Sequence, residues 1–183
     1  MAASPGGPGR LPGVVHTIRT ATLRDVPAIA EVNVASWRAA YRGQFPDHVL
    51  DALSVEERSQ RRGEWMADDG GEMRHWVLLS DDRIAGYADS GPARDVGLAG
   101  KPGEVWTIYL HPDFWDAGAG RLLFAHSVDD LRDRGFGPLV LWVLETNARA
   151  RAFYEAAGWA WDGATRTDDE PGYTVYEVRY RLG

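Results

Sequence analysis

The chain has 183 residues, of which 44% are hydrophobic, 11% aromatic and 26% charged, as is typical of one ordinary globular domain. It contains no cysteine, which excludes disulfides, cysteine zinc sites and acyl-cysteine intermediates. The net charge of −7, with no basic stripe in the sequence, argues against nucleic-acid binding. The five histidines are scattered along the chain, so no metal site is expected.

The N-terminal segment differs in composition from the rest of the chain. Residues 1–13 are rich in Ala, Ser, Pro and Gly and lack the apolar stretch of a signal peptide. No later run approaches the roughly 20 apolar residues that a membrane span requires. We therefore expect a disordered tail over 1–13, a single domain over 14–183, and a cytoplasmic protein with no membrane partner.

The first predicted elements are a short strand and two helices. β-Branched residues indicate a strand over 14–19. Apolar residues that recur at steps of three and four predict an amphipathic helix from 25 to about 41. A second helix is expected from about 54 to 68, where Ser54 and Glu57 have the spacing of a capping box.

The remainder of the chain alternates between strand and helix patterns. We expect a hairpin of strands 75–80 and 84–90, a loop, and a central strand over 104–110. Helix 118–134, strand 139–144, helix 148–157 and strands around 159–161 and 173–182 follow. The predicted fold class is α/β (α+β), with a mixed sheet of about seven strands and four helices, in which 104–110 and 139–144 form the parallel pair.

A glycine pair stands between the central strand and the next helix. Gly118 and Gly120 allow close approach of a ligand to the backbone, and the helix N-terminus and Arg121 attract an anion. The same pair is also compatible with a simple tight turn. A Walker loop is disfavoured because Arg121 and not Lys follows Gly120, and a Rossmann fingerprint would need a third glycine where Leu123 stands.

A second pattern lies on helix 148–157. Asn147 and Tyr154 are seven residues apart, close to two helical turns, so both point the same way with the small Ala150 between them. A slender ligand arm could lie along this stripe. The alternative is structural, with Asn147 capping the helix, Tyr154 packing in the core and Gly158 ending the helix.

Taken together, these patterns resemble the GNAT superfamily of acyl-CoA N-acyltransferases, over nearly the whole chain after the tail. Three segments carry the resemblance: 108–112 (Ile-Tyr-Leu-His-Pro), 118–121 (Gly-Ala-Gly-Arg) and 147–159. The family's cofactor loop usually begins with Gln or Arg, and Trp115 stands at that position here. This departure affects one side-chain contact to pyrophosphate, which the loop backbone and Arg121 can replace.

The resemblance implies acetyl-CoA as co-substrate, without a metal. Its pantetheine arm would pair with the backbone of the central strand, and its pyrophosphate would lie on the glycine loop. The cofactor-binding residues implied are Ile108, Tyr109, Leu110, Asp116, Ala117, Gly118, Ala119, Gly120, Arg121, Asn147 and Tyr154.

By the same likeness, the backbone N–H near Leu110 would face the thioester oxygen, and Tyr154 would protonate the leaving thiolate as general acid. Glu104 is the candidate base, because it begins the central strand near the acceptor side. Water could take that role instead, and a glutamate at a strand edge is usually only solvated.

The acceptor is expected beside the end of the first long helix, where Trp37 and Tyr41 share one face. Aromatic walls can hold an ammonium group, although such pairs are more often core packing. We expect an N-acetyltransferase acting on a primary amine of a small molecule. The alternatives are a protein or peptide N-acetyltransferase and a non-catalytic acyl-CoA sensor. A homodimer is expected, because it is common in this fold.

Overall fold

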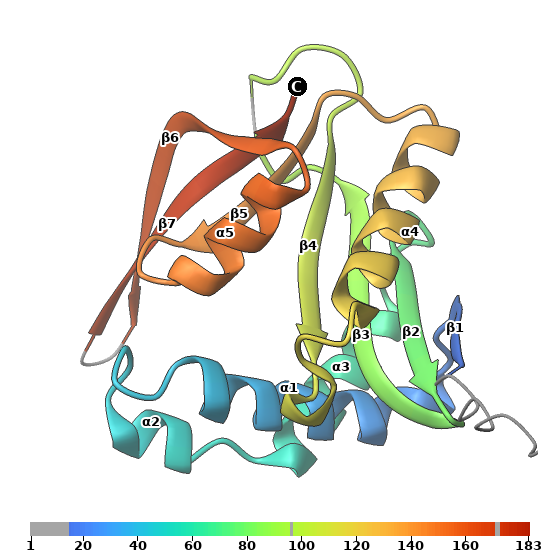
Figure 1. Cartoon of the computed structure of the whole chain (residues 1–183), viewed down its shortest axis with the longest axis vertical. Coiled ribbons are helices and arrows are strands. Elements are labelled where there is room, and N and C mark those ends of the chain that lie inside the picture. The colour runs from blue at the N-terminus through green and yellow to red at the C-terminus, as the bar shows by residue number, and fades with distance from the viewer. Residues whose placement is uncertain (1–14, 96, 171–172) are drawn as a thin grey trace, which may run out of the picture.

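The structure is a computed structural model that describes residues 15–95, 97–170 and 173–183. The predicted tail, residues 1–13, lies outside the described residues. The strands are β1 (His16–Thr20), β2 (Arg74–Ser80), β3 (Arg83–Pro92), β4 (Gly103–Leu110), β5 (Leu139–Leu144), β6 (Trp159–Glu170) and β7 (Tyr173–Leu182). They form one mixed sheet in the order β1-β2-β3-β4-β5-β7-β6 (Figure 1). The predicted fold class is confirmed.

In the described part of the chain, five α-helices accompany the sheet, one more than predicted. They are α1 (Val26–Ala40), α2 (Asp47–Asp51), α3 (Val55–Ala67), α4 (Ala119–Asp133) and α5 (Ala148–Ala156). The sequence does not reveal α2, because five residues are too few to show a helical period. The start of α3 is as predicted, since the Ser54 side chain accepts a hydrogen bond from the Glu57 N–H at 3.3 Å.

The helices cover both faces of the sheet. Ile29 of α1 packs against Val77 and Tyr87 on one face. On the other face, Leu123 of α4 packs against Ala88. α1 and α4 each bury an apolar stripe in this way, which stabilises the core.

The sheet opens in its centre, between β4 and β5. These strands are parallel, as predicted, but they pair only through Gly103 with Leu139 and Glu104 with Val140. Beyond Glu104 the two strands diverge, and Figure 1 shows the β5–β7 part turning away from β4. Backbone groups on this edge of β4 are therefore available to a ligand.

β6 is longer than predicted. We expected a strand around 159–161, but it continues to Glu170, with a register shift against β7 between Trp161 and Thr165. The added residues are mostly polar and exposed, so no apolar alternation marks them as a strand. This extension matters for the site, because β6 and β7 reach past the open end of the sheet.

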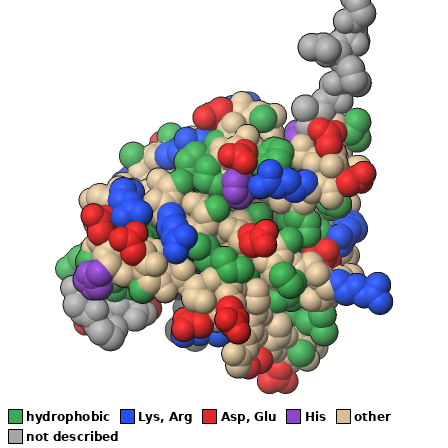
Figure 2. Space-filling model, turned by 90° about the horizontal axis from the view of Figure 1, so that it is seen from below, with side chains coloured by type: hydrophobic (Ala, Val, Ile, Leu, Met, Phe, Trp, Pro, Cys, Tyr) green, Lys and Arg blue, Asp and Glu red, His purple; other side chains and the backbone are tan. Residues whose placement is uncertain are grey.

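Charged side chains of both signs lie on the surface of the molecule. Acidic and basic side chains are interspersed on the face seen in Figure 2, without an extended basic patch there. Across the described part of the chain, no helix is long and apolar enough to cross a membrane. The same residues contain no group of three or more His, Asp or Glu side chains suited to holding a metal ion.

Candidate active site

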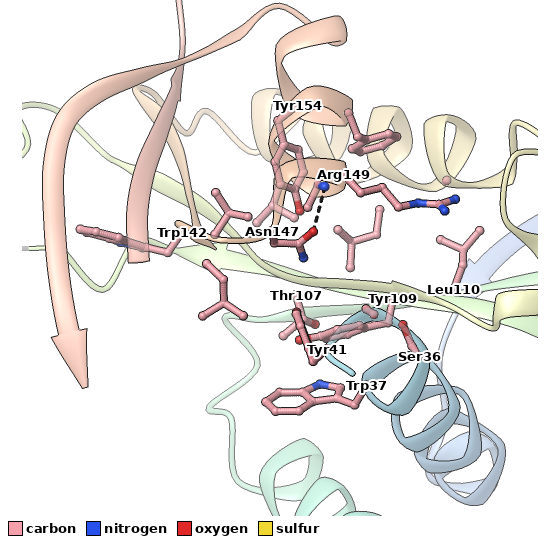
Figure 3. Close-up of a pocket in the computed structure, with 18 of the residues that line it drawn as sticks. Ser36, Trp37, Tyr41, Thr107, Tyr109, Leu110, Trp142, Asn147, Arg149 and Tyr154 are labelled. Atoms are coloured by element: carbon pink, nitrogen blue, oxygen red, sulfur yellow. Dashed lines mark hydrogen bonds between the residues drawn. The ribbon is translucent and has the colours of Figure 1, made fainter. Parts of the chain in front are cut away.

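A cavity of about 890 Å³ occupies the opening between β4 and β5. In Figure 3, Asn147 and Tyr154 of the α5 segment enter it from one side, and Trp37 and Tyr41 of the α1 segment from the other. β4 forms the wall between them. Sequence elements that lie far apart therefore meet where the sheet is split.

Most of the predicted site residues line this cavity. They are Trp37, Tyr41, Ile108, Tyr109, Leu110, Asp116, Gly118, Gly120, Arg121, Asn147 and Tyr154. Ala117 and Ala119 do not line it, and Ala119 is fully buried against Leu123 in the core. At the head of α4, Gly118, Gly120 and Arg121 therefore line the cavity, whereas Ala119 packs into the core.

The loop before α4 has the geometry of an anion cradle. Gly118 caps the helix in the left-handed region with φ of 81°, and Asp116 also has a positive φ of 62°. The first backbone hydrogen bond of α4 runs from the Arg121 N–H to the Gly118 carbonyl. The preceding N–H groups have no partner inside the helix, so they and the helix dipole attract a phosphate.

Trp115, which replaces the usual Gln or Arg, is held in place by two contacts. Its indole N–H donates to the Leu110 carbonyl at 3.0 Å. The Arg149 guanidinium lies 4.3 Å from its ring centre and donates to the Asp116 carboxylate at 2.9 Å. Arg149 of α5 therefore places a positive charge beside the loop, where Trp115 replaces the usual Gln or Arg. No motif in the sequence indicated this role of Arg149.

Asn147 and Tyr154 fit both the ligand-binding and the structural interpretation of α5. The Asn147 side chain accepts a hydrogen bond from the Ala150 N–H at 3.0 Å, so it caps the helix while also facing the cavity (Figure 3). Gly158, with φ of 86°, ends the helix as expected. Within the described residues, the Tyr154 hydroxyl has no hydrogen-bond partner. It is therefore free to interact with a bound ligand.

Three tyrosines surround the centre of the cavity. Burial raises the pKa of the Tyr154 hydroxyl above its ordinary value, and nearby Tyr109 adds to the effect. Burial likewise raises the pKa of Tyr41, again with a contribution from Tyr109. These hydroxyls therefore keep their protons at neutral pH and can act as donors.

Trp37 and Tyr41 form part of an aromatic cluster at the other end. Their rings meet edge to face with centres 4.9 Å apart, as expected from their shared helix face. Phe45, which follows α1, lies with its ring centre 5.2 Å from that of Tyr173 at the start of β7. All four side chains line the cavity. Sequence reasoning missed Phe45 and Tyr173, because their contact joins segments more than a hundred residues apart.

Glu104 does not lie where its predicted role requires. Its side chain is fully buried and forms an ion pair with Arg94, and it also accepts a hydrogen bond from the Arg94 backbone N–H at 3.0 Å. It is not among the cavity-lining residues. The geometry favours a structural role, in which Glu104 holds the segment after β3 against β4.

We expect the substitution Glu104→Gln to lower the free energy of unfolding, by about 2 kcal/mol, because it weakens charged hydrogen bonds to Arg94. Thermal or denaturant unfolding measures this. Unchanged stability together with a large fall in kcat would contradict the structural role and restore Glu104 as the base.

Comparison with known sequences agrees with the geometry. Residues 33–159 match the model of the Acetyltransferase (GNAT) family. "Uncharacterized N-acetyltransferase YuaI" of Bacillus subtilis is 32% identical over 142 residues, which cover 76% of this chain and 78% of that protein. "Mycothiol acetyltransferase" of Thermobifida fusca is 30% identical over 170 residues, 86% of this chain but only 48% of the relative. The chain thus spans about half the length of this second relative.

Other matches differ in the acceptor that their names state. A "[Ribosomal protein bS18]-alanine N-acetyltransferase" of Salmonella typhimurium is 37% identical over 81 residues, 44% of this chain and 51% of that protein. Among solved structures, PaiA N-acetyltransferase from Thermoplasma acidophilum in complex with coenzyme A has a TM-score of 0.67 and 16% identity, and covers 90% of this chain and 98% of its own. At 16% identity this structural match supports the fold alone.

Proposed function

Since the chain belongs to the GNAT family of acetyltransferases, and is thus an acetyl-CoA-dependent N-acetyltransferase, we propose that its acceptor is a primary amine of a small molecule. The observation that supports a small acceptor is the contact between Phe45 and Tyr173. It joins the segment after α1 to the β6–β7 hairpin across the acceptor end of the cavity. An extended polypeptide lying across that end would have to break this contact.

The cofactor lies, in our proposal, on the α4 and α5 side of β4. Pyrophosphate rests on the N–H groups at the head of α4, with Arg121 and Arg149 as cations. The pantetheine arm follows the free edge of β4 beyond Glu104. Trp115 already uses the Leu110 carbonyl, so this arm takes its hydrogen bonds from the other backbone groups of Ile108 and Leu110.

The thioester then lies between α5 and β4. The backbone N–H near Leu110 stabilises the oxyanion, and Tyr154 donates its proton to the leaving thiolate. Burial raises the pKa of Tyr154, so the hydroxyl is protonated and can donate a hydrogen bond as negative charge develops on the sulfur. With Glu104 outside the cavity, we propose that water takes the proton that the amine must lose.

A protein or peptide acceptor is the second candidate, favoured by the relative named for ribosomal protein acetylation. A sensor without catalytic activity is the third. The hydroxyl of Tyr154 lies in the cavity without a hydrogen-bond partner among the described residues. This counts against a sensor, because packing alone needs no hydroxyl there.

A competition between acceptors tests the proposal. Purified protein and acetyl-CoA are incubated with 2-phenylethylamine, a diamine, an amino sugar and a peptide with a free N-terminus, and released thiol and acetylated product are measured. We expect kcat/KM for at least one small amine to exceed that of the peptide by about tenfold or more. Acetylation of the peptide alone would contradict the small-molecule assignment.

A further inference from the structure

One wall of the cavity is backed by a buried charged cluster. Asp89 of β3 is fully buried, and Arg62 of α3 donates to its two oxygens at 2.6 and 2.5 Å. His75 of β2 lies with Nδ1 2.7 Å from the Asp89 carboxylate and Nε2 2.8 Å from that of Asp69. The contacts of Arg62 and His75 hold the Asp89 carboxylate in one position.

The cluster reaches the cavity through Thr107. The Thr107 hydroxyl is hydrogen-bonded to Oδ2 of Asp89, while the residue itself lines the cavity (Figure 3). The register of the sheet brings this about. Asp89 of β3 pairs directly with Thr107 of β4, at the end of a regular run of pairs that begins with Gly86 and Leu110. β4 bulges only at the next residue toward its start, Trp106, because Ser90 pairs with Val105.

The ionisation of Asp89 determines which of the two groups donates this hydrogen bond. Although burial opposes its ionisation, the guanidinium of Arg62 and the hydrogen bonds of His75, Arg62 and Thr107 hold the pKa of Asp89 below its ordinary value. An ionised carboxylate can only accept, so the hydroxyl proton of Thr107 points toward Asp89. Only the lone pairs of Thr107 Oγ1 remain for a ligand in the cavity.

Thr107 thus differs from the tyrosines of the cavity. Tyr154 can donate a hydrogen bond to a ligand, and the hydroxyls of Tyr41 and Tyr109, which interact with each other, also keep their protons. Thr107 can offer only an acceptor, on the same face of β4 as Tyr109, where the aromatic cluster of Trp37 and Tyr41 begins. A nucleophile that carries N–H groups is the partner that this arrangement fits.

We propose that Thr107 accepts a hydrogen bond from an N–H of the acceptor amine and orients it toward the thioester, with Asp89 as the positioning residue behind it. This inference rests on the proposed function. It predicts that the site selects amines by their N–H groups and not by positive charge alone.

The test compares binding of two cations to the protein saturated with coenzyme A. These are 2-phenylethylamine and its N,N,N-trimethyl analogue, which has the charge and the ring but no N–H. We expect the wild type to bind the primary amine about tenfold more tightly, the free-energy difference of one charged hydrogen bond. Thr107→Val, which keeps the shape and removes the oxygen, should bind both cations equally. Thr107→Ser should restore the preference.

Thr17→Val on the edge strand β1 is the matched control and should keep the preference. Titration of each variant with coenzyme A reports whether it is folded, and Thr107→Ala replaces the valine variant if that one does not fold. If Thr107→Val still prefers the primary amine over its trimethyl analogue, the size of the methyl groups causes the preference and Thr107 does not. A wild-type protein that binds both cations equally would also overturn the proposed role of Thr107. This experiment measures binding only, whereas the competition between acceptors measures turnover. Failure of the proposed role of Thr107 can therefore be distinguished from failure of the proposed function.

Discussion

Replacing Tyr154 with Phe is expected to lower kcat about a hundredfold while the affinity for acetyl-CoA changes little. The substitution removes only the hydroxyl, which has no partner among the described residues and faces the cavity. The ring, which packs against Phe124 and Phe153, remains. Steady-state kinetics with the best small amine, together with calorimetric titration of acetyl-CoA, measure the two quantities separately.

Tyr180→Phe is the matched control for this change. Tyr180 belongs to the same buried cluster, but its hydroxyl donates to Glu155 at 2.6 Å and accepts from Arg151 at 3.1 Å, outside the cavity. Its loss should affect stability more than turnover. Unchanged kcat in Tyr154→Phe with tight acetyl-CoA binding would refute Tyr154 as the general acid.

Gly120→Glu should weaken acetyl-CoA binding about a hundredfold or more, equivalent to about 2.7 kcal/mol. Gly120 lines the cavity at the head of α4, where the phosphates are proposed to lie. A glutamate there fills the cradle and repels the phosphates at short range. Calorimetric titration measures the loss, and part of it should persist at high salt because the side chain also blocks the space sterically.

Gly120→Ala separates charge and size from the loss of glycine itself. A Cβ at this position would lie 3.6 Å from Leu110 Cδ1 and 3.7 Å from Phe153 Cε2, both ordinary contact distances. We therefore expect the alanine variant to bind acetyl-CoA nearly as well as the wild type. Equal binding by the glutamate variant would place the phosphates elsewhere.

The features that the sequence predicted well are local ones. Gly118, Gly120 and Asn147 lie at helix ends, where the capping and turn requirements of a few neighbouring residues determine the conformation. The helix face shared by Trp37 and Tyr41 follows from the helical period alone. These parts of the fold and the site could therefore be predicted without knowing the tertiary structure. The dimer that we expect remains a prediction.

The features that the sequence missed depend on distant partners. Glu104 has an unremarkable place at the start of a strand, and only the ion pair with Arg94 makes it structural. The role of Thr107 depends on its pairing with Asp89 of the neighbouring strand. Arg149 reaches Trp115 and Asp116 from another helix. Pairings of this kind leave no periodic signal in one sequence.

The most direct test of the central claim is calorimetric titration of acetyl-CoA into the purified wild-type protein. Acetyl transfer through the cavity between β4 and β5 requires that the cofactor bind there. We predict saturable binding of one acetyl-CoA per chain, weakened by Gly120→Glu and retained by Tyr154→Phe. Absence of binding by well-folded wild-type protein would contradict the proposed function.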